Sequence, residues 1–215
     1  MQIFPRAANT VARATLALAA FLTVGVPTAV AVLQRSSYAT GVGVPRQQPI
    51  PFSHKHHVSD AGLDCRYCHT SVERSPFAGM PSTDTCMNCH RQLWNESEML
   101  EPVRASYRSG VPIAWTRVYD LPDFVYFDHS IHVAKGVGCS TCHGRVDTMP
   151  LTWRATALEM HWCLDCHRHP ERHVRPREKV FEMAYEPPPD QLALGTRLVQ
   201  AYGIQSKTSC STCHR

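Results

Sequence analysis

The residues with the most evident chemistry are ten cysteines, all of which lie in Cys-x-x-Cys-His motifs. The five motifs are Cys65–His69, Cys86–His90, Cys139–His143, Cys163–His167 and Cys210–His214. Such a motif is typical of c-type haem attachment, in which both thiols form thioethers with the porphyrin and the adjoining histidine binds the iron. The sequence therefore predicts five covalently attached haem c groups. Their attachment residues are Cys65, Cys68, Cys86, Cys89, Cys139, Cys142, Cys163, Cys166, Cys210 and Cys213, and their proximal iron ligands are His69, His90, His143, His167 and His214.

Other uses of so many cysteines fit the pattern less well. A disulfide framework has no reason to place a histidine directly after every second cysteine. Structural zinc takes two such half-sites per ion, so five motifs would leave one unpaired. The formal net charge of +4 also lacks the dense basic footprint of a nucleic-acid-binding protein.

Eight of the 13 histidines lie outside the motifs and could supply the sixth iron ligands. Four of them form His-x-x-His pairs, His54 with His57 and His129 with His132, and each pair comes shortly before a haem motif. Histidines at this spacing share one face of a helical turn. These four side chains are therefore predicted to be distal iron ligands.

The order of features occurs twice along the chain. An aromatic residue (Phe52 or Phe127), a histidine pair, a haem motif, a Met-Pro dipeptide and a second haem motif follow one another in both copies. This internal repeat indicates two dihaem units, at residues 52–91 and 127–168. The fifth motif ends one residue before the chain does.

The predicted fold is mainly α, with a few short helices, long loops and a core packed by haem. With 16 prolines, the chain can hardly close a core with side chains alone, so the haem-free protein should be largely unfolded. We expect a helix over residues 191–202, capped by Asp190. Helical spacing near Leu93 to Leu100 should end at Pro102, and a strand-like stretch lies around Trp115–Tyr119.

The N-terminal region predicts a membrane helix. Residues 14–33 are uncharged and about long enough to cross a bilayer, and Arg6 and Arg13 precede them. A cleaved signal with Ala29-Val30-Ala31 at the cleavage site is the alternative. We expect an uncleaved single-pass anchor at residues 1–35 and a linker at 36–51. The first dihaem unit with its inter-unit segment then takes residues 52–126, and the second unit with the fifth haem takes 127–215.

The motifs resemble those of small class III periplasmic cytochromes. In that family the first histidine of a pair binds the haem just downstream and the second reaches a later haem. The resemblance assigns His54 to the Cys65–His69 haem and His57 to a neighbouring one, that of Cys86–His90. It assigns His129 to the Cys139–His143 haem and His132 to the Cys210–His214 haem.

The Cys163–His167 haem is then left to a local ligand. Met149, Met160 and His161 are the candidates, and Met149 is preferred. A methionine ligand raises the reduction potential relative to two histidines. Four bis-histidine haems and one His/Met haem are therefore expected. His56, His161, His169 and His173 are expected not to be ligands.

The whole chain is similar to the pentahaem cytochrome c subunit of alternative complex III, notably in the run VPIAWTRVYDLPDFVYFDHSIHV. The resemblance implies an electron-transfer subunit, not an enzyme, on the periplasmic side of the cytoplasmic membrane. It would carry electrons from quinol oxidation to a soluble periplasmic carrier or terminal oxidase. Implied partners are integral-membrane quinol-binding subunits, an iron–sulfur and molybdopterin-enzyme-like subunit and a monohaem cytochrome c, with no nucleic acid.

The rival hypothesis is a multihaem reductase of the nitrite or sulfite type. Such an enzyme needs an iron with an open position for its substrate. Abundant candidate ligands argue against an open position, and all five motifs end in histidine.

Overall fold

The computed structural model describes residues 4–214. The chain forms two compact units, and the boundary between them in the sequence lies between Val42 and Gly43. The first unit is an apolar helix over Ala8–Arg35. It comprises α1 (Ala8–Ala20), a π-helical turn η1 (Phe21–Gly25) and α2 (Val26–Arg35), and the short α3 (Ser37–Thr40) follows. Pro27 lies in the first turn of α2, directly after η1. Proline has no backbone N–H to donate. It is tolerated in the first turn of a helix because an N–H there would have no partner within the helix.

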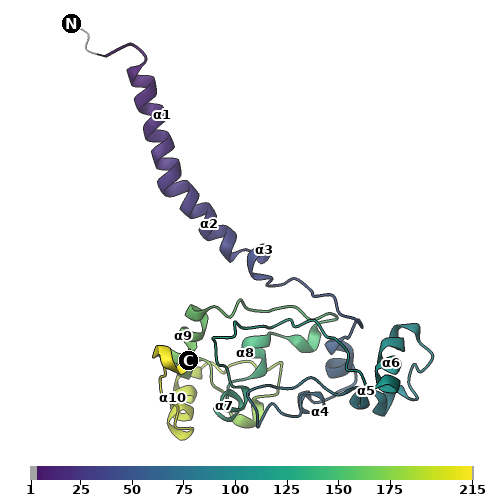
Figure 1. The fold of residues 1–215 in the computed structure, drawn as a ribbon. Coiled ribbons are helices and arrows are strands. Elements are labelled where there is room, and N and C mark those ends of the chain that lie inside the picture. The colour runs from purple at the N-terminus through teal and green to yellow at the C-terminus, as the bar shows by residue number, and fades with distance from the viewer. Residues whose placement is uncertain (1–3, 215) are drawn as a thin grey trace. The chain divides into compact units, whose positions relative to one another are not determined.

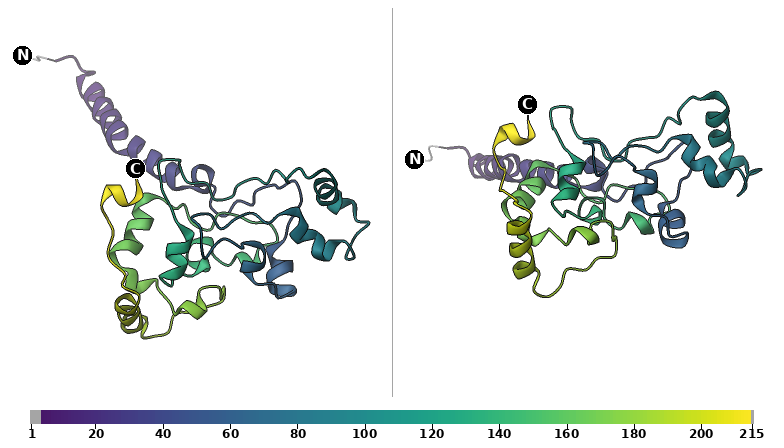
Figure 2. Two further views of the ribbon diagram at one scale, coloured as in Figure 1. Left: turned by 60° about the horizontal axis from the view of Figure 1, so that its bottom comes forward. Right: turned by 90° about the horizontal axis from the view of Figure 1, so that it is seen from below.

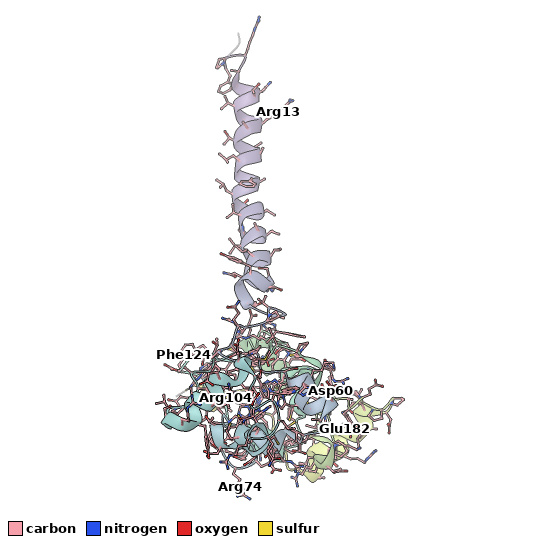
Figure 3. The ribbon with its side chains drawn as sticks, turned by 90° about the vertical axis from the view of Figure 1, so that its right-hand side faces the viewer. Arg13, Asp60, Arg74, Arg104, Phe124 and Glu182 are labelled. Atoms are coloured by element: carbon pink, nitrogen blue, oxygen red, sulfur yellow. The ribbon has the colours of Figure 1, made fainter. Side chains whose placement is uncertain are left out.

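The helix is long and apolar enough to cross a membrane. Its 28 residues rise about 1.5 Å each, more than the roughly 30 Å of hydrocarbon in a bilayer. Its side chains, including Arg13, extend from the helix on all sides, and α1, η1 and α2 contain no buried residue (Figure 3). This length and composition suit a membrane anchor and a signal sequence alike.

The second unit holds short helices joined by long loops, and no strand is assigned anywhere in residues 4–214. The first repeat contains η2 (Lys55–Asp60), α4 (Cys65–Cys68) and α5 (Thr83–His90). The second contains α7 (His129–Ala134), α8 (Cys139–His143), η4 (Val146–Thr148) and α9 (Met160–Arg168). Between and after them lie η3 (Glu98–Leu100), α6 (Glu101–Ser109), η5 (Pro170–Arg172), η6 (Arg177–Lys179), α10 (Gln191–Ala201) and α11 (Cys210–Cys213). The predicted mainly helical fold is confirmed.

Side chains alone form only a small core. One cluster of buried residues consists of Ile50, Met87, Leu100 and Val103, and it lies beside α5 and α6. Elsewhere the described residues that are buried and apolar are few: Val72, Met149, Val174, Val180 and Met183. A core of this size is consistent with an interior completed by porphyrin.

Three local expectations need correction. The helix does not end at Pro102, because proline occupies the first turn of α6, where its missing N–H costs nothing. The stretch around Trp115–Tyr119 is not a strand, since Gln48 satisfies both backbone groups of Thr116 with its side-chain amide. The helix after Asp190 forms as α10, but the Asp190 side chain makes no capping hydrogen bond.

Candidate haem-binding site

Each of the five Cys-x-x-Cys segments lies on a helical turn, in α4, α5, α8, α9 and α11. The histidine of the first motif donates its backbone N–H to the carbonyl of the first cysteine, His69 to Cys65, at 2.9 Å. The last motif repeats this bond, from His214 to Cys210, at 2.8 Å. Residues three and four apart share one face of a helix. Both thiols and the imidazole of a motif are therefore presented together, as covalent attachment to one porphyrin requires.

The cysteine thiols are suited to attachment and not to acid–base or nucleophilic work. Burial raises the pKa of Cys142 to about 12 and those of Cys139 and Cys166 to about 11. A reactive cysteine has a lowered pKa and an electropositive surrounding. These thiols have the opposite environment.

Three proximal histidines face a histidine of a His-x-x-His pair. The ring centroids are 6.2 Å apart for His57 and His90, 6.4 Å for His129 and His143, and 6.1 Å for His132 and His167. An iron held between two imidazoles, about 2.0 Å from each nitrogen, would set the centroids about 6.3 Å apart. The spacing of all three pairs therefore fits a six-coordinate haem iron.

The remaining member of the first pair, His54, lies near His69. Burial, together with the neighbouring His69 and His57 rings, lowers the pKa of His54 to about 4. Burial likewise lowers the pKa of His143 to about 4, with further contributions from His129, His69 and His54. A neutral imidazole is the form that binds a metal. His54 therefore has His69 as a neighbour, and its assignment to the Cys65–His69 haem stays a prediction.

The partner of His132 differs from the sequence assignment. The structure brings His132 to His167, in the second motif of its own repeat, and not to His214. The reason is that α7 presents His129 and His132 one turn apart, toward α8 and α9 respectively. The His167 iron then has no need of Met149, whose side chain is only 2% exposed and approaches Gly144.

Hydrogen bonds at Nδ1 distinguish the candidate ligands. Nδ1 bonds a backbone carbonyl in His57 (Ser53, 2.8 Å), His69 (Gly79, 2.7 Å), His90 (Leu93, 3.1 Å), His129 (Pro76, 2.7 Å), His132 (Asp128, 2.6 Å) and His214 (Phe124, 3.1 Å). A carbonyl can only accept, so Nδ1 carries the proton and Nε2 keeps its lone pair for a metal. His54 bonds the Thr152 hydroxyl instead, at 2.9 Å.

The other histidines have different partners. A ring nitrogen of His56, His161, His169 and His173 lies 3.2–3.8 Å from a carboxylate of Asp60, Glu159, Glu171 and Asp165 respectively. The side chain of His161 is 74% exposed. That none of the four binds iron stays a prediction.

Sequence reasoning missed the aromatic residues that hold the imidazoles. Phe52 stacks on His57 at 4.4 Å and Phe127 on His132 at 4.5 Å, and each also meets the first histidine of its pair edge-on. Tyr119 packs on His143 at 4.5 Å and accepts a hydrogen bond from the Ala155 N–H. The aromatic residue two positions before each pair was the available signal for the first two. Tyr119 had none.

The motifs lie in a row. Burial is the main cause of the raised pKa values of four cysteines, and in each case a sulfur of another motif raises the pKa further. The pairs, with the affected cysteine first, are Cys68 and Cys86, Cys139 and Cys65, Cys142 and Cys166, and Cys163 and Cys213. These four sulfurs therefore each have a neighbour from another motif, and the four pairs define the order second, first, third, fourth, fifth. Figure 1 shows the same sequence across the unit, from α5 through α4 and α8 to α9 and the C-terminus, and Figure 2 agrees.

The fifth motif lies at one end of this row. The Cys213 carbonyl accepts the Tyr126 N–H at 2.8 Å, and Phe124 packs on His214 with ring centroids 5.6 Å apart. Phe124 itself is at the periphery of the unit (Figure 3). Among the ring contacts of residues 4–214, no histidine faces His214. The ring contacts thus provide no imidazole pair at the fifth motif, unlike the second, third and fourth.

Comparison with known proteins supports this assembly of sites. Residues 125–215 match the family of cytochrome c7 and related cytochromes c, and residues 29–108 match the class III cytochrome c family. Over 99 residues the chain is 41% identical to the multihaem cytochrome c subunit of menaquinone reductase from Nitratidesulfovibrio vulgaris strain Hildenborough. That match covers 46% of each protein, so the chain spans about half the length of this relative.

Both matched segments carry a histidine pair with its haem motifs, and the ring pairs have the spacing that haem iron requires. The chain is thus a multihaem cytochrome c, similar in its two parts to the class III and c7 families.

Proposed function

We propose that the chain is the pentahaem electron-transfer subunit of a membrane complex that oxidises quinol, of the alternative complex III kind. The observation that carries the proposal is the row of five motifs, three of which have an imidazole pair at iron spacing. Haem iron supplies one-electron oxidation and reduction. Histidines on both faces of an iron keep its geometry fixed, so that electrons pass with little rearrangement.

The chain's own residues define the proposed route. The second motif, at α5, forms one end and the fifth, at α11, the other, with the first, third and fourth between them. His54 and His69, His57 and His90, His129 and His143, and His132 and His167 would each hold one iron. Backbone carbonyls at Nδ1 orient five of these rings, those of His57, His69, His90, His129 and His132.

We propose Met160 as the sixth ligand of the Cys210–His214 haem. Met149, the methionine expected from the sequence at the Cys163–His167 haem, is then not a ligand. Met160 begins α9, three residues before Cys163, so both side chains lie on one face of the helix. Cys163 is also the residue whose sulfur neighbours Cys213 of the last motif. Met160 is 68% exposed, which leaves its thioether free to bind. His161 lies on a different face, beside Glu159.

Removal of the thioether tests this ligand. Ferric haem with a methionine ligand has a weak red absorption band that bis-histidine haem lacks, and Met160→Ala should abolish it and lower the potential of one haem. Met149→Leu, which retains the buried volume, is the matched control and should keep the band. If the band survives in Met160→Ala and disappears in Met149→Leu, the assignment to Met160 is refuted.

The proposed setting is the cytoplasmic membrane, with Ala8–Arg35 as the anchor and the haem unit on the periplasmic side. Covalent haem attachment on the outer side of bacterial membranes supports this sidedness. We propose quinol-binding membrane subunits, an iron–sulfur and molybdopterin-enzyme-like subunit and a monohaem cytochrome c as partners, and a soluble carrier or terminal oxidase as acceptor. We infer no catalytic role for the chain itself.

Electron flow in the reverse direction is the second candidate. The relative from Nitratidesulfovibrio vulgaris is named as a subunit of a menaquinone reductase. A chain of this kind could then deliver electrons from a periplasmic donor to quinone. The fold and ligand set are the same in both cases, and only the direction differs.

Rapid mixing of the intact membrane complex with a menaquinol analogue tests the proposal. We expect haem absorbance to show reduction within turnover time, and a quinol-site inhibitor should abolish it. His57→Ala should slow reduction, whereas His169→Ala, which alters a carboxylate-paired histidine, should not. The reverse direction would be supported if quinol never reduces the haems but added menaquinone oxidises them in a complex that was reduced beforehand. Exchange with neither would refute a quinone-linked role.

A further inference from the structure

Arg175 is a buried cation beside the third haem motif. Arg175 is only 6% exposed, and its guanidinium donates hydrogen bonds to the Ser140 and Thr141 hydroxyls at 3.1 and 3.3 Å. These are the two residues between Cys139 and Cys142. The guanidinium also bonds the Glu182 carbonyl at 3.2 Å and lies 4.5 Å from the centre of the Tyr185 ring.

The surrounding backbone fixes this position. The Arg175 N–H donates to the Gly136 carbonyl at 2.9 Å, and the Cys139 N–H donates to the Val180 carbonyl at 3.1 Å. A Cβ atom at Gly138 would lie 2.1 Å from the guanidinium carbon. Glycine directly before Cys139 therefore leaves the space that the guanidinium occupies.

Arg175 interacts electrostatically with Tyr185 and Glu182 but lacks a full carboxylate partner. None of the ion pairs found in residues 4–214 includes it, and Nε is buried without a hydrogen-bond partner. The Glu182 carboxylate binds Lys179 at 2.7 Å. A buried charge without a counter-ion acts on its surroundings with little screening.

The first repeat has the opposite arrangement. Asp64 stands directly before Cys65, where the second repeat has Gly138 before Cys139. Its carboxylate binds Arg66 at 2.8 Å, and both side chains are about half exposed, at 46% and 48%. The cation here is paired and in contact with water, so its field is largely cancelled.

The geometry points to Arg175 as a positioning charge that raises the reduction potential of the Cys139–His143 haem above that of its neighbour, the Cys65–His69 haem. Reduction lowers the charge of a ferric haem by one. A fixed cation close by disfavours the oxidised form and so favours reduction. The haem in the middle of the proposed row would then hold electrons preferentially. This inference rests on the proposed ligand set, and it does not depend on the partner that supplies the electrons.

Redox titration of the purified holoprotein, followed by haem absorbance, tests the inference. Arg175→Gln should lower the reduced-to-oxidised ratio of one haem about tenfold at fixed ambient potential, a downward shift of about 59 mV for one electron. Arg175→Lys keeps the charge and should restore the potential. Arg66→Gln, the matched change beside the first motif, leaves the exposed Asp64 unpaired and should lower the potential of one other haem by much less, because water screens that site.

A second variant keeps the test decisive if Arg175→Gln fails to retain its haems. Asp64→Asn removes the carboxylate beside Cys65 and should raise the potential of one other haem. The inference is overturned if Arg175→Gln with five haems attached shifts no potential, shifts all five alike, or behaves as Arg175→Lys does. It is also overturned if Asp64→Asn leaves every potential unchanged. Failure of quinol to reduce the intact complex would refute the proposed function and leave these shifts intact.

Discussion

The two dihaem units place their histidines in nearly the same way, although their sequences differ in length. Phe52 stacks on His57 at 4.4 Å and 19°, and Phe127 stacks on His132 at 4.5 Å and 25°. The second histidine of each pair faces the histidine of the second motif in its own unit. The ring centroids are 6.2 Å apart and the planes 66° apart for His57 and His90, and the values are 6.1 Å and 71° for His132 and His167. The first unit nevertheless has one residue more between its pair and its first motif.

The extra residue is accommodated by a change of helix type. The segment after His54 is the π-helix η2, whereas α7 is an α-helix. A π-helical turn accepts one residue more than an α-helical turn over the same span. In both units the backbone carbonyl of the second histidine then accepts a hydrogen bond from the N–H two residues before the first cysteine. The donor is Leu63 in the first unit and Val137 in the second. The ring geometry, and not the residue count, is what the two units share.

The largest effects should follow removal of the second histidine in each unit. His57→Ala and His132→Ala should each leave one iron without its sixth ligand, so one haem equivalent becomes high-spin and binds carbon monoxide. His169→Ala is the control and should change nothing. Equal behaviour of the two histidine variants would support the correspondence between the units.

Electron paramagnetic resonance identifies the haem that is affected. Crossed ligand planes leave two iron d orbitals nearly equal in energy and give a highly anisotropic signal, whereas parallel planes give a rhombic one. The crossed pairs are His57–His90 and His132–His167, and the His129–His143 planes lie only 15° apart. His132→Ala should therefore remove a highly anisotropic signal. Loss of a rhombic signal instead would contradict the pairing with His167.

The Met-Pro dipeptides should differ sharply between the units. Met149 is 2% exposed and Met80 is 63% exposed. Met149→Ala should lower the free energy of unfolding by about 2–5 kcal/mol through the cavity it leaves, whereas Met80→Ala should change it little. Urea denaturation of the holoproteins measures both. Neither change should produce high-spin haem, and its appearance in Met149→Ala would return Met149 to the list of iron ligands.

The attachment motifs, the repeat and the helical character could be predicted from the sequence because they depend on local spacing. A histidine directly after each second cysteine has one main chemical use, and His-x-x-His places two imidazoles on one helix face. The proximity of His54 to His69, of His57 to His90 and of His129 to His143 followed from sequence order in the same way.

The partner of His132 could not be predicted because it depends on where α9 packs relative to α7, which no short-range pattern records. The same is true of Tyr119 on His143 and of Arg175 beside Cys139, since each comes from a loop distant in sequence. The π-helix was signalled only by a difference of one residue in spacing. Residues that touch the haem motifs from elsewhere in the chain are thus the part that requires the structure.

Two corresponding glycines should differ in how well they tolerate a side chain. Gly62 and Gly136 both stand three residues before a first cysteine, with φ of +70° and +78°. Gly62→Ala should cost about 1–2 kcal/mol from backbone strain alone, because nothing lies within 4 Å of its Cβ position. Gly136→Ala should cost about 1–3 kcal/mol more, because its Cβ would lie 2.4 Å from the Arg175 carbonyl oxygen. Equal urea midpoints for the two variants would contradict this contact.

The smallest expected effect is the pH dependence that Asp64 contributes in the first unit. Hydrogen bonding from the Arg66 side chain holds the pKa of Asp64 below its usual value. The folded state thus favours the carboxylate, so its contribution is complete above the ordinary pKa of about 3.9 and is lost as the pH falls through the lowered value. Asp64 is about half exposed, so the contribution is small. The urea midpoints of wild type and Asp64→Asn should differ by a constant amount from neutral pH to about 4 and converge below it. Gly138, at the corresponding position of the second unit, carries no charge and adds no such contribution. A gap that widened on acidification would mean that Asp64 is better stabilised when protonated.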